Sequence, residues 1–194
     1  MKVVMVNTYS ILINNILKFI KTEFNGLYII IPEVHCDERG SFSEIYNKLL
    51  LSNLLGYNID FCQDNKVEST KMVLRGLHLQ AEPYSQTKLV SVSTGKIFDV
   101  VVDVRAGSKT YGKYFTIELD SKTKKILLVP KGFAHGYLTL SEYAVVNYKV
   151  DNYYNKESEI GIRYDDKHLD IDWGFDNSKF IISKKDKTLK DFDW

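Results

Sequence analysis

The chain has 194 residues, a length that fits one globular domain. Its 44% of hydrophobic and 26% of charged residues can build one sizeable core, which excludes a disordered or low-complexity chain. The 26 Lys and Arg residues against 25 Asp and Glu leave a formal net charge of +1. No global field therefore attracts nucleic acid or an anionic membrane, and any anion binding must come from a local arrangement of charges.

Two features bear on the compartment of the protein. The apolar stretch 11–20 is interrupted by three polar residues, so it is too short and too polar to span a membrane, and no signal-peptide cleavage pattern follows it. Cys36 and Cys62 lack the spacing of a disulfide framework or a zinc knuckle. We therefore expect a cytoplasmic protein with no membrane partner, in which both cysteines are reduced packing residues.

The first 22 residues are expected to form an N-terminal extension of a single domain over 23–194. Their apolar side chains suit either a short amphipathic helix or an additional strand, and the pattern leaves both open. From Leu27 the sequence changes character. Residues 27–31 form a short apolar run that ends at Pro32, which predicts a buried strand.

The rest of the chain reads as one helix followed by many short strands. Residues 37–40 predict a turn, and residues 47–55 predict a helix, because leucines gather on one side and Gly56 follows. Apolar segments then recur at the interval of a strand plus a turn, over 72–79, 88–93, 97–104, 114–119, 126–129, 137–140 and 144–150. This recurrence predicts an all-β sandwich or barrel, with a polar helix or strap after Ser183.

Two of the four histidines lie in apolar, strand-like stretches. His78 follows Gly76-Leu77 and His135 follows Phe133-Ala134, where a buried imidazole needs a partner or a chemical role. A hydrogen-bonded core histidine is the alternative for each. The spacing does not suit a metal centre, because a His-x-His pair with a nearby Glu is absent and position 80 is Gln. We therefore expect no metal ligand among them.

Charged residues also interrupt the apolar strands. Asp99 is flanked by Phe98 and Val100, so it needs a cationic or imidazole neighbour, whereas Asp103 with Arg105 suits an ion pair or a turn anchor. A histidine base, a tyrosine acid and a lysine cation, without a nucleophilic Ser or Cys motif, would suit proton abstraction next to a carbonyl. For any one of the 13 tyrosines, simple packing is the alternative.

An ordered series of motifs runs through most of the chain. It comprises Asp37-Glu38-Arg39-Gly40-x-Phe42-x-Glu44, Gln63-Asp64-Asn65, Leu74-Arg75-Gly76-Leu77-His78-x-Gln80, Lys88-Leu89-Val90, Phe98-Asp99-Val100, Pro130-x-Gly132-Phe133-Ala134-His135-Gly136 and Tyr148-Lys149. Over residues 24–190 this series closely resembles the dTDP-4-dehydrorhamnose 3,5-epimerase family.

The resemblance implies a cupin-type jelly roll (double-stranded β-helix) with a few short peripheral helices. It implies a homodimer whose N-terminal strands are exchanged between subunits, a nucleotide-sugar substrate, no nucleic acid, and neither a metal nor an organic cofactor. The implied reaction of this isomerase inverts C3 and C5 of dTDP-4-dehydro-6-deoxy-D-glucose and gives dTDP-4-dehydro-L-rhamnose.

The resemblance also implies roles for individual residues. His78 would be the base that takes the ring proton, and Tyr148 would return a proton on the opposite face. Lys88 would stabilise the enolate oxygen at C4. Asp186, in Ile182-Ser183-Lys184-Lys185-Asp186, is the candidate partner of the base, with Asp99 as the alternative.

A further set of residues matches family positions that hold the nucleotide, the pyrophosphate and the sugar. The set is Arg39, Glu44, Gln63, Asn65, Arg75, His135, Glu159 and Lys185. Arg39 and Glu44 lie on the exchanged strands, so they are expected to reach the partner's site. For each residue of the set, the alternative is a surface salt bridge of little energetic value.

One segment departs from the family pattern. After Asn65 the family usually continues with a small polar or His-Ser pair, whereas this chain has Lys66-Val67-Glu68-Ser69, which we interpret as a loop bordering the site. The alternatives are a single-site C3 or C5 epimerase on a related nucleotide 4-keto-6-deoxy sugar, and a catalytically silent cupin that only binds a nucleotide sugar. Sugar 3,4-ketoisomerases share the fold but lack this His and Tyr arrangement.

Overall fold

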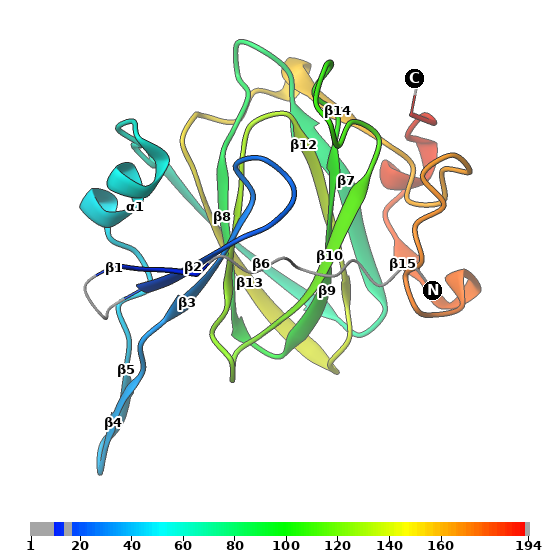
Figure 1. Cartoon of the computed structure of the whole chain (residues 1–194). Coiled ribbons are helices and arrows are strands. Elements are labelled where there is room, and N and C mark those ends of the chain that lie inside the picture. The colour runs from blue at the N-terminus through cyan, green and yellow to red at the C-terminus, as the bar shows by residue number, and fades with distance from the viewer. Residues whose placement is uncertain (1–9, 14–16, 193–194) are drawn as a thin grey trace.

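The computed structural model describes residues 10–13 and 17–192, and in this part of the chain two β-sheets pack face to face (Figure 1). The seven-stranded sheet has the order β1 (Ser10–Ile13), β2 (Leu17–Lys21), β3 (Tyr28–Pro32), β11 (Ile126–Val129), β8 (Lys88–Thr94), β13 (Tyr143–Val150) and β6 (Gln63–Thr70). The other sheet has the order β10 (Tyr114–Asp120), β9 (Lys96–Asp103), β12 (Phe133–Thr139), β7 (Val73–Gln80) and β14 (Glu159–Gly161), with β15 (Ile181–Ile182) parallel to β7. The predicted all-β, cupin-type jelly roll is confirmed.

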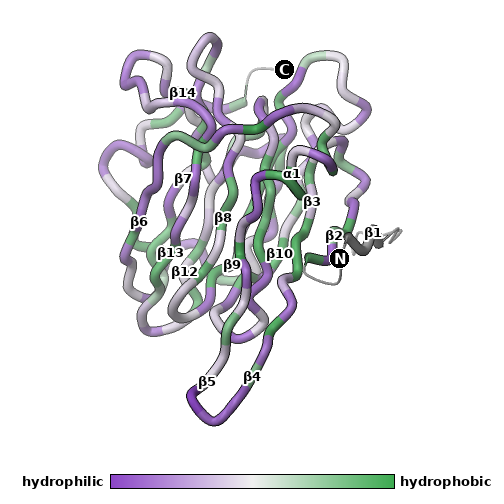
Figure 2. Tube along the Cα trace, turned by 90° about the vertical axis from the view of Figure 1, so that its left-hand side faces the viewer, coloured by the Kyte–Doolittle hydropathy of each residue, from purple (hydrophilic) through white to green (hydrophobic). Residues whose placement is uncertain are grey.

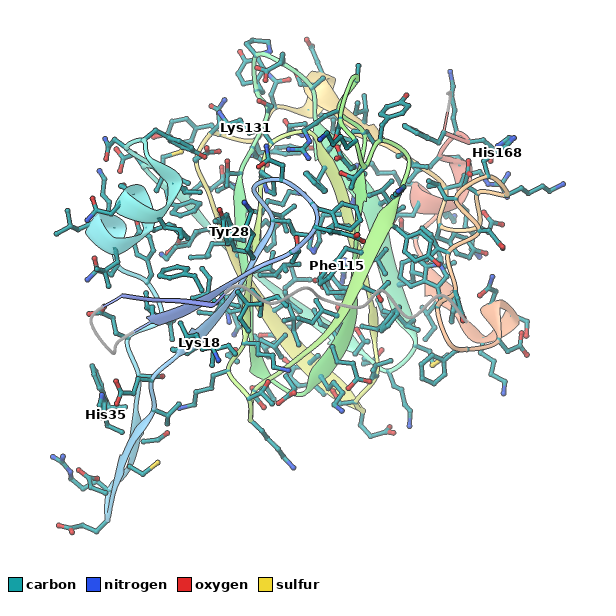
Figure 3. All side chains as sticks on the ribbon, in the orientation of Figure 1. Lys18, Tyr28, His35, Phe115, Lys131 and His168 are labelled. Atoms are coloured by element: carbon teal, nitrogen blue, oxygen red, sulfur yellow. The ribbon has the colours of Figure 1, made fainter. Side chains whose placement is uncertain are left out.

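Period-two alternation along the strands builds the core between the sheets. On β8, Val90 and Val92 face the other sheet and are buried, whereas Ser91 between them faces outward. Phe115 of β10 closes the core from the opposite sheet, while the exposed Lys18 points away from the body (Figure 3). A second apolar cluster, which includes Trp173, lies between the outer face of β7, β9 and β12 and the C-terminal segment.

The predicted helix is α1 (Lys48–Leu55), and it covers the outer face of the seven-stranded sheet. The Asn47 side chain caps its first turn by accepting from the Leu50 amide at 3.1 Å. Gly56 ends it in the left-handed region, with φ of 75°. The other helices of the described chain are single 3-10 turns, η1 (Lys156–Ser158), η2 (Asn177–Lys179) and η3 (Asp186–Thr188), and none of the described helices is long and apolar enough to cross a bilayer.

Most of the expected strands are confirmed to within a residue or two, but two expectations about β-structure were wrong. Residues 63–70 form edge strand β6 rather than a loop; only Val67 among its eight residues is apolar, so the pattern carried no strand signal. Strand β12 begins at Phe133 and not at Tyr137. Gly132, with φ of 77°, forms the turn that precedes it, so the histidine motif belongs to the strand.

The two remaining expectations concern the N-terminal segment and the cysteines. For the described part of residues 1–22, the strand alternative is found: β2 pairs with β3 inside the sheet, and Phe19 is fully buried. Residues 1–9 and 14–16 of this segment lie outside the described residues. The prediction that Cys36 and Cys62 pack in the interior is wrong, because both are exposed, one on a hairpin and the other just before edge strand β6.

The hairpin of β4 (His35–Asp37) and β5 (Gly40–Phe42) projects from the body (Figures 1 and 2). All six of its strand residues are exposed, including the large Phe42 side chain, and the predicted turn at its tip is hydrophilic. The Arg39 guanidinium pairs there with Asp37. A lone two-stranded ribbon is at best marginally stable in water, so this arm needs a surface to pack against.

Asp103 at the end of β9 anchors the following turn, as predicted. Its fully buried carboxylate accepts from Arg105 Nη2 at 2.7 Å, from Ser108 Oγ at 2.5 Å and from Thr110 Oγ1 at 2.6 Å. Burial acts to raise the pKa of Asp103, but these hydrogen bonds outweigh it and hold the pKa at about 2. The charged form therefore stabilises the fold at neutral pH, and this contribution is lost as the pH falls from about 4 to about 2.

We expect Asp103→Ala to lower the free energy of unfolding by about 3 kcal/mol at pH 7, because the change leaves the Arg105 charge and two hydroxyls without their acceptor. Urea unfolding at pH 7 and at pH 2 measures the effect, which should shrink at the lower pH. Asp60→Ala, which removes an exposed ion pair with Lys48, is the control and should cost little. An equal penalty at both pH values would contradict the assignment.

Candidate active site

A cavity of about 570 Å³ opens between the two sheets at one end of the sandwich. The seven-stranded sheet contributes Lys88 and Tyr148 to its wall, and the other sheet contributes His78 and His135. The C-terminal segment closes one side with Asp186. The cavity therefore combines two imidazoles, a phenol, an ammonium and a carboxylate from five separate parts of the chain.

His78 is paired with a carboxylate that lies 108 residues away in sequence. Its Nε2 is 2.9 Å from Oδ1 of Asp186, and the other Asp186 oxygen accepts from the Gly76 amide at 3.2 Å. The Asp186 side chain is 5% exposed and that of His78 is 27% exposed, so the imidazole faces the cavity and the carboxylate lies behind it. Burial acts to raise the pKa of Asp186, but the hydrogen bond and charge interaction with His78 and the hydrogen bonds with Gly76 and Ser183 together outweigh it, so the pKa is lowered.

A close backbone contact holds the two histidine strands together. Gly76 of β7 has φ of 114°, and a Cβ on it would lie 2.6 Å from Gly136 Cα and 2.7 Å from the His135 carbonyl oxygen. A side chain at this point would push β7 and β12 apart, so the position requires glycine. His78 and His135 are direct cross-strand partners beside this contact, which sets the two imidazoles side by side.

Lys88 is a buried cation, and its side chain faces the cavity from β8. Its Nζ donates to the His78 carbonyl oxygen at 3.2 Å. Burial lowers the pKa of Lys88 to about 8, while the charges of Asp99 and Glu159 oppose that shift. An ammonium held in a water-poor site is suited to stabilise negative charge that develops on a bound molecule.

Asp99 lies beside His135 and not beside His78. Its Oδ2 is 2.8 Å from His135 Nε2, and its side chain is fully buried. The expected imidazole neighbour of Asp99 is thus found, and of the two candidate partners for His78 the structure places Asp186 there. Among the described residues, no three His, Cys, Asp or Glu side chains converge as a metal site would require.

Tyr148 lines the cavity from β13, on the sheet opposite His78. Burial raises the pKa of its phenol, so the group stays protonated at neutral pH and can act as a proton donor. Arg75 lies nearby, where its Nε donates to Ser69 Oγ at 3.0 Å.

An ion pair with a tyrosine partner lies at the mouth of the cavity. Lys185 Nζ contacts Glu159 Oε2 at 2.5 Å, and the Tyr154 hydroxyl donates to the same oxygen at 2.8 Å. Burial acts to raise the pKa of Glu159, but the contacts with Lys185 and Tyr154 outweigh it and lower the pKa.

Eight of the twelve predicted site residues line this cavity, and four do not: Arg39, Glu44, Gln63 and Asn65. Arg39 lies on the projecting arm. The Glu44 side chain instead accepts from Asn47, the capping residue of α1, at 3.1 Å. Gln63 donates to Asn65 at 2.9 Å on edge strand β6, and its side-chain oxygen accepts from the Tyr154 amide at 3.2 Å.

The cavity also has lining residues that the sequence did not single out as site residues, and those with polar or aromatic side chains are Gln80, Gln86, Tyr137, Tyr154 and Ser183. The aliphatic Val67 is another. For Tyr154, the available signal in the sequence was the pair Tyr153-Tyr154 in a polar segment just after the predicted strand 144–150. Val67 belongs to the segment that departs from the family pattern, and it reaches the cavity because strand alternation turns it inward.

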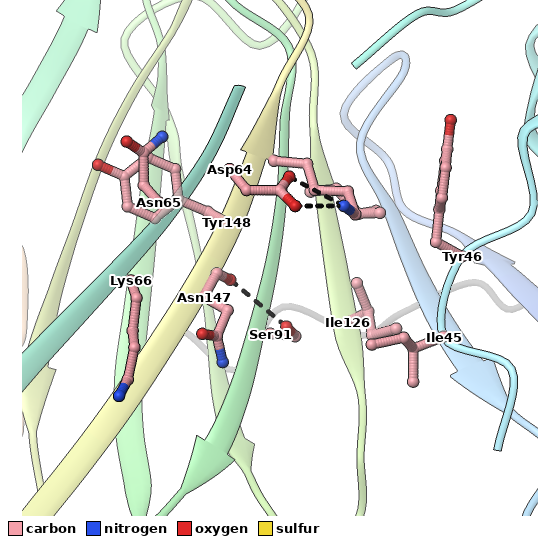
Figure 4. Close-up of a pocket in the computed structure, with 11 residues that line it drawn as sticks. Ile45, Tyr46, Asp64, Asn65, Lys66, Ser91, Ile126, Asn147 and Tyr148 are labelled. Carbon is pink, nitrogen blue, oxygen red and sulfur yellow. Dashed lines mark hydrogen bonds and ion pairs between the residues drawn. The ribbon is translucent and has the colours of Figure 1, made fainter. Parts of the chain in front are cut away.

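A second pocket of about 320 Å³ lies on the outer face of the seven-stranded sheet (Figure 4). It is lined by Ile45, Tyr46 and residues of β6, β8, β11 and β13, which include the predicted site residues Asn65 and Tyr148. The carboxylate of Asp64 accepts twice from Lys149 Nζ at 2.8 Å, so these charges neutralise each other. This pocket contains no imidazole, and we therefore assign the candidate chemistry to the inner cavity.

Burial lowers the pKa of Lys88 to about 8. Below that pH Lys88 is protonated in the folded state, and its buried charge destabilises the fold. The cost is about 3 kcal/mol at pH 7 for a shift of this size. We expect Lys88→Met to raise the free energy of unfolding at pH 7, with a gain that shrinks as the pH rises from 8 towards 10.5, where wild-type Lys88 is neutral in the folded state.

Urea unfolding as a function of pH measures this gain. Lys131→Met, which replaces an exposed lysine, is the matched control and should change little. A Lys88→Met protein less stable than the wild type at pH 7 would show that the ammonium is not held at a cost.

Comparisons with known proteins agree with this geometry. The model of the dTDP-4-dehydrorhamnose 3,5-epimerase family matches residues 21–193. The dTDP-4-dehydrorhamnose 3,5-epimerase of Escherichia coli is 45% identical over 170 residues, which cover 88% of this chain and 91% of that protein. The crystal structure of the Elizabethkingia anophelis enzyme of the same name superposes with a TM-score of 0.88 at 46% identity, over 91% of this chain and 96% of that one.

A second crystal structure, of a dTDP-6-deoxy-D-glucose-3,5-epimerase from Legionella pneumophila in complex with dTDP-4-keto-L-rhamnose, has a TM-score of 0.86 at 43% identity and covers 90% of this chain and 92% of that one. The match of the family model extends over nearly the whole chain, including all the cavity residues described above. The chain belongs to the dTDP-4-dehydrorhamnose 3,5-epimerase family.

Proposed function

We propose that this protein inverts C3 and C5 of dTDP-4-dehydro-6-deoxy-D-glucose and gives dTDP-4-dehydro-L-rhamnose. The observation that carries the proposal is the pairing of His78 with Asp186 on one wall of a cavity whose opposite sheet carries Tyr148 and Lys88. Inversion at carbon requires a base on one face of the sugar ring and an acid on the other. Two sheets that face each other supply both.

The chemistry follows from the C4 ketone. It acidifies the protons on both neighbouring carbons, because the resulting carbanion is an enolate with its negative charge on the C4 oxygen. In the proposed reaction His78 removes the proton, and Asp186 stabilises the imidazolium that forms. The Lys88 ammonium stabilises the enolate oxygen, and the Tyr148 hydroxyl returns a proton from the opposite face.

The nucleotide part of the substrate needs cationic and hydrogen-bonding groups. Arg75, His135 and Lys185 line the cavity, and we assign them to the phosphate and sugar oxygens. We assign the Glu159 carboxylate, which accepts hydrogen bonds, to a sugar hydroxyl. Gln63 and Asn65 are proposed to complete the nucleotide site from β6. Tyr154 is exposed at the mouth of the cavity.

We further propose a homodimer in which the β4–β5 arm of one subunit packs against the other, so that Arg39 and Glu44 of the exchanged segment serve the site of the partner. The fully exposed hairpin supports this, because it has almost no contacts with its own body apart from Lys124 Nζ donating to Ser41 Oγ at 2.9 Å. Edge strand β6 offers an unpaired row of backbone groups beside the cavity.

Mixing two inactive variants tests the dimer. Arg39→Ala disables the arm and His78→Ala disables the base, so each pure variant should lose most activity. After the two are unfolded and refolded together, statistical pairing with one restored site in each mixed dimer predicts recovery to about a quarter of wild-type activity. Activity no higher than the sum of the two pure variants would rule out a shared site, and sedimentation of the wild type checks the dimer itself.

We propose the cytoplasm as the compartment, because Cys36 and Cys62 are exposed thiols without a disulfide. Cell fractionation with immunodetection tests this.

Exchange with solvent tests the reaction. Wild-type protein incubated with dTDP-4-dehydro-6-deoxy-D-glucose in heavy water should introduce deuterium at both C3 and C5, with inverted configuration detected by NMR. His78→Ala should lower turnover by about two to four orders of magnitude, since it removes the general base. His168→Ala, which replaces an exposed histidine that does not line the cavity, is the control and should retain activity.

Tyr148→Phe separates the acid from the base within the same experiment. It should slow formation of the inverted product more than the first proton exchange, because the base remains in place. Equal loss of both would contradict the assignment of Tyr148. Label at a single carbon would indicate a single-site epimerase, and a folded protein that binds the nucleotide sugar without exchanging any proton would be a binding protein only.

A further inference from the structure

A buried carboxylate lies directly behind the cavity wall without reaching the cavity. Asp99 of β9 is fully buried and is not among the lining residues. One of its oxygens contacts His135 Nε2 at 2.8 Å, and the other, Oδ1, has no hydrogen-bond partner in the described structure. Burying a carboxylate costs free energy, and leaving one oxygen unpaired adds to that cost.

The titratable groups that interact with Asp99 come from β8 and β12, and besides Lys88 and His135 they include Tyr137, its direct cross-strand partner on β12. From β8 the Lys88 ammonium interacts with it electrostatically, and from β12 the His135 imidazole is bonded to it. His78 on β7 and Glu159 on β14 face the same cavity. Burial raises the pKa of Asp99, while His135 and Lys88 act to lower it, so the carboxylate and its two neighbours are coupled.

We propose that Asp99 is a positioning residue that acts through two cavity groups: it keeps Lys88 cationic and fixes His135 as the tautomer protonated on Nε2. The inference rests on the proposed function, because it assigns to Asp99 the maintenance of charge that the enolate requires. The carboxylate compensates part of the cost of burying the ammonium next to apolar sheets. It also leaves His135 with an unprotonated Nδ1.

A purely structural role does not account for this arrangement. Asp103, two pleats along the same strand and on the same face, is also fully buried, but three residues saturate its carboxylate. Asp99 has a single hydrogen-bonded partner, and the residues that it influences are cavity groups. A fixed charge that orients the groups contacting substrate is the arrangement expected of an electrostatically preorganised site.

The test compares the dependence of kcat on pH in Asp99→Asn and in Asp103→Asn. In the wild type, kcat should fall above a pH of about 8, where Lys88 loses its proton. Asp99→Asn should lower kcat at pH 7 by about tenfold or more with little change in KM, since the lost interaction acts on charge that develops in the transition state. In Asp99→Asn, the fall of kcat at alkaline pH should begin about one pH unit lower than in the wild type, because the Lys88 ammonium has lost the negative charge of Asp99 that stabilises it.

Asp103→Asn is the matched control. It should lower the melting temperature and leave the alkaline fall of kcat at the same pH as in the wild type. The proposal is overturned if kcat of folded Asp99→Asn falls at the same alkaline pH as in the wild type, or if this variant loses activity only in proportion to its unfolded fraction.

A second measurement needs no substrate and no variant. In the 15N NMR spectrum of histidine-labelled wild type, His135 should carry its proton on Nε2 between pH 6.5 and 8. A proton on Nδ1 alone would mean that Asp99 is the protonated partner, which contradicts the proposal. This readout stays valid if the wild type fails to epimerise the proposed sugar, so failure of the function and failure of this inference are distinguished.

Discussion

The cost of burying charge inside an apolar sandwich is the constraint on which the rest of the site depends. Most of the space between the sheets is filled by branched aliphatic and aromatic side chains. At one end, Lys88 and Asp99 replace them, and the burial of each ion costs free energy. The pairing of Asp99 with His135 and of Asp186 with His78, together with the attraction between Asp99 and Lys88, compensates part of this cost. It leaves the imidazoles and the ammonium facing one cavity. The same low-polarity surroundings lower the pKa of Lys88 and make its charge effective on a bound molecule.

The cavity is formed by elements that lie close together because of a tight backbone contact between two strands. The contact between Gly76 and Gly136 brings β7 and β12 closer than side chains would permit, and the C-terminal segment then lies over β7, where Asp186 reaches both His78 and the Gly76 amide. The arm, in contrast, leads away from the body (Figure 1). Its exposed Phe42 and the unpaired edge of β6 are two surfaces of one subunit that remain incomplete by themselves, in keeping with the proposed exchange between subunits.

Much of the site could be predicted because its residues interrupt apolar strands in recognisable motifs. His78, Lys88, His135 and Tyr148 each stand where a polar side chain in a buried strand needs an explanation, and all four line the cavity. Strand β6 could not be predicted in this way. An edge strand with one exposed face carries polar residues at nearly every position, so its hydrophobic pattern resembles that of a loop. The exposure of the two cysteines could not be predicted for a related reason, because composition does not reveal which segments lie outside the core.

The sequence by itself determined the all-β class, the helix with its end at Gly56, and the family, because hydrophobic period, helix-ending glycine and ordered motifs are local properties of the chain. Only the tertiary structure decided which carboxylate supports which histidine. In the sequence, the family resemblance made Asp186 the candidate partner of His78 and left Asp99 as the alternative. The strand order places Asp99 against His135, and the C-terminal segment carries Asp186 across 108 positions to His78. Such pairings depend on register and on the path of distant segments in space, and no local pattern contains that information.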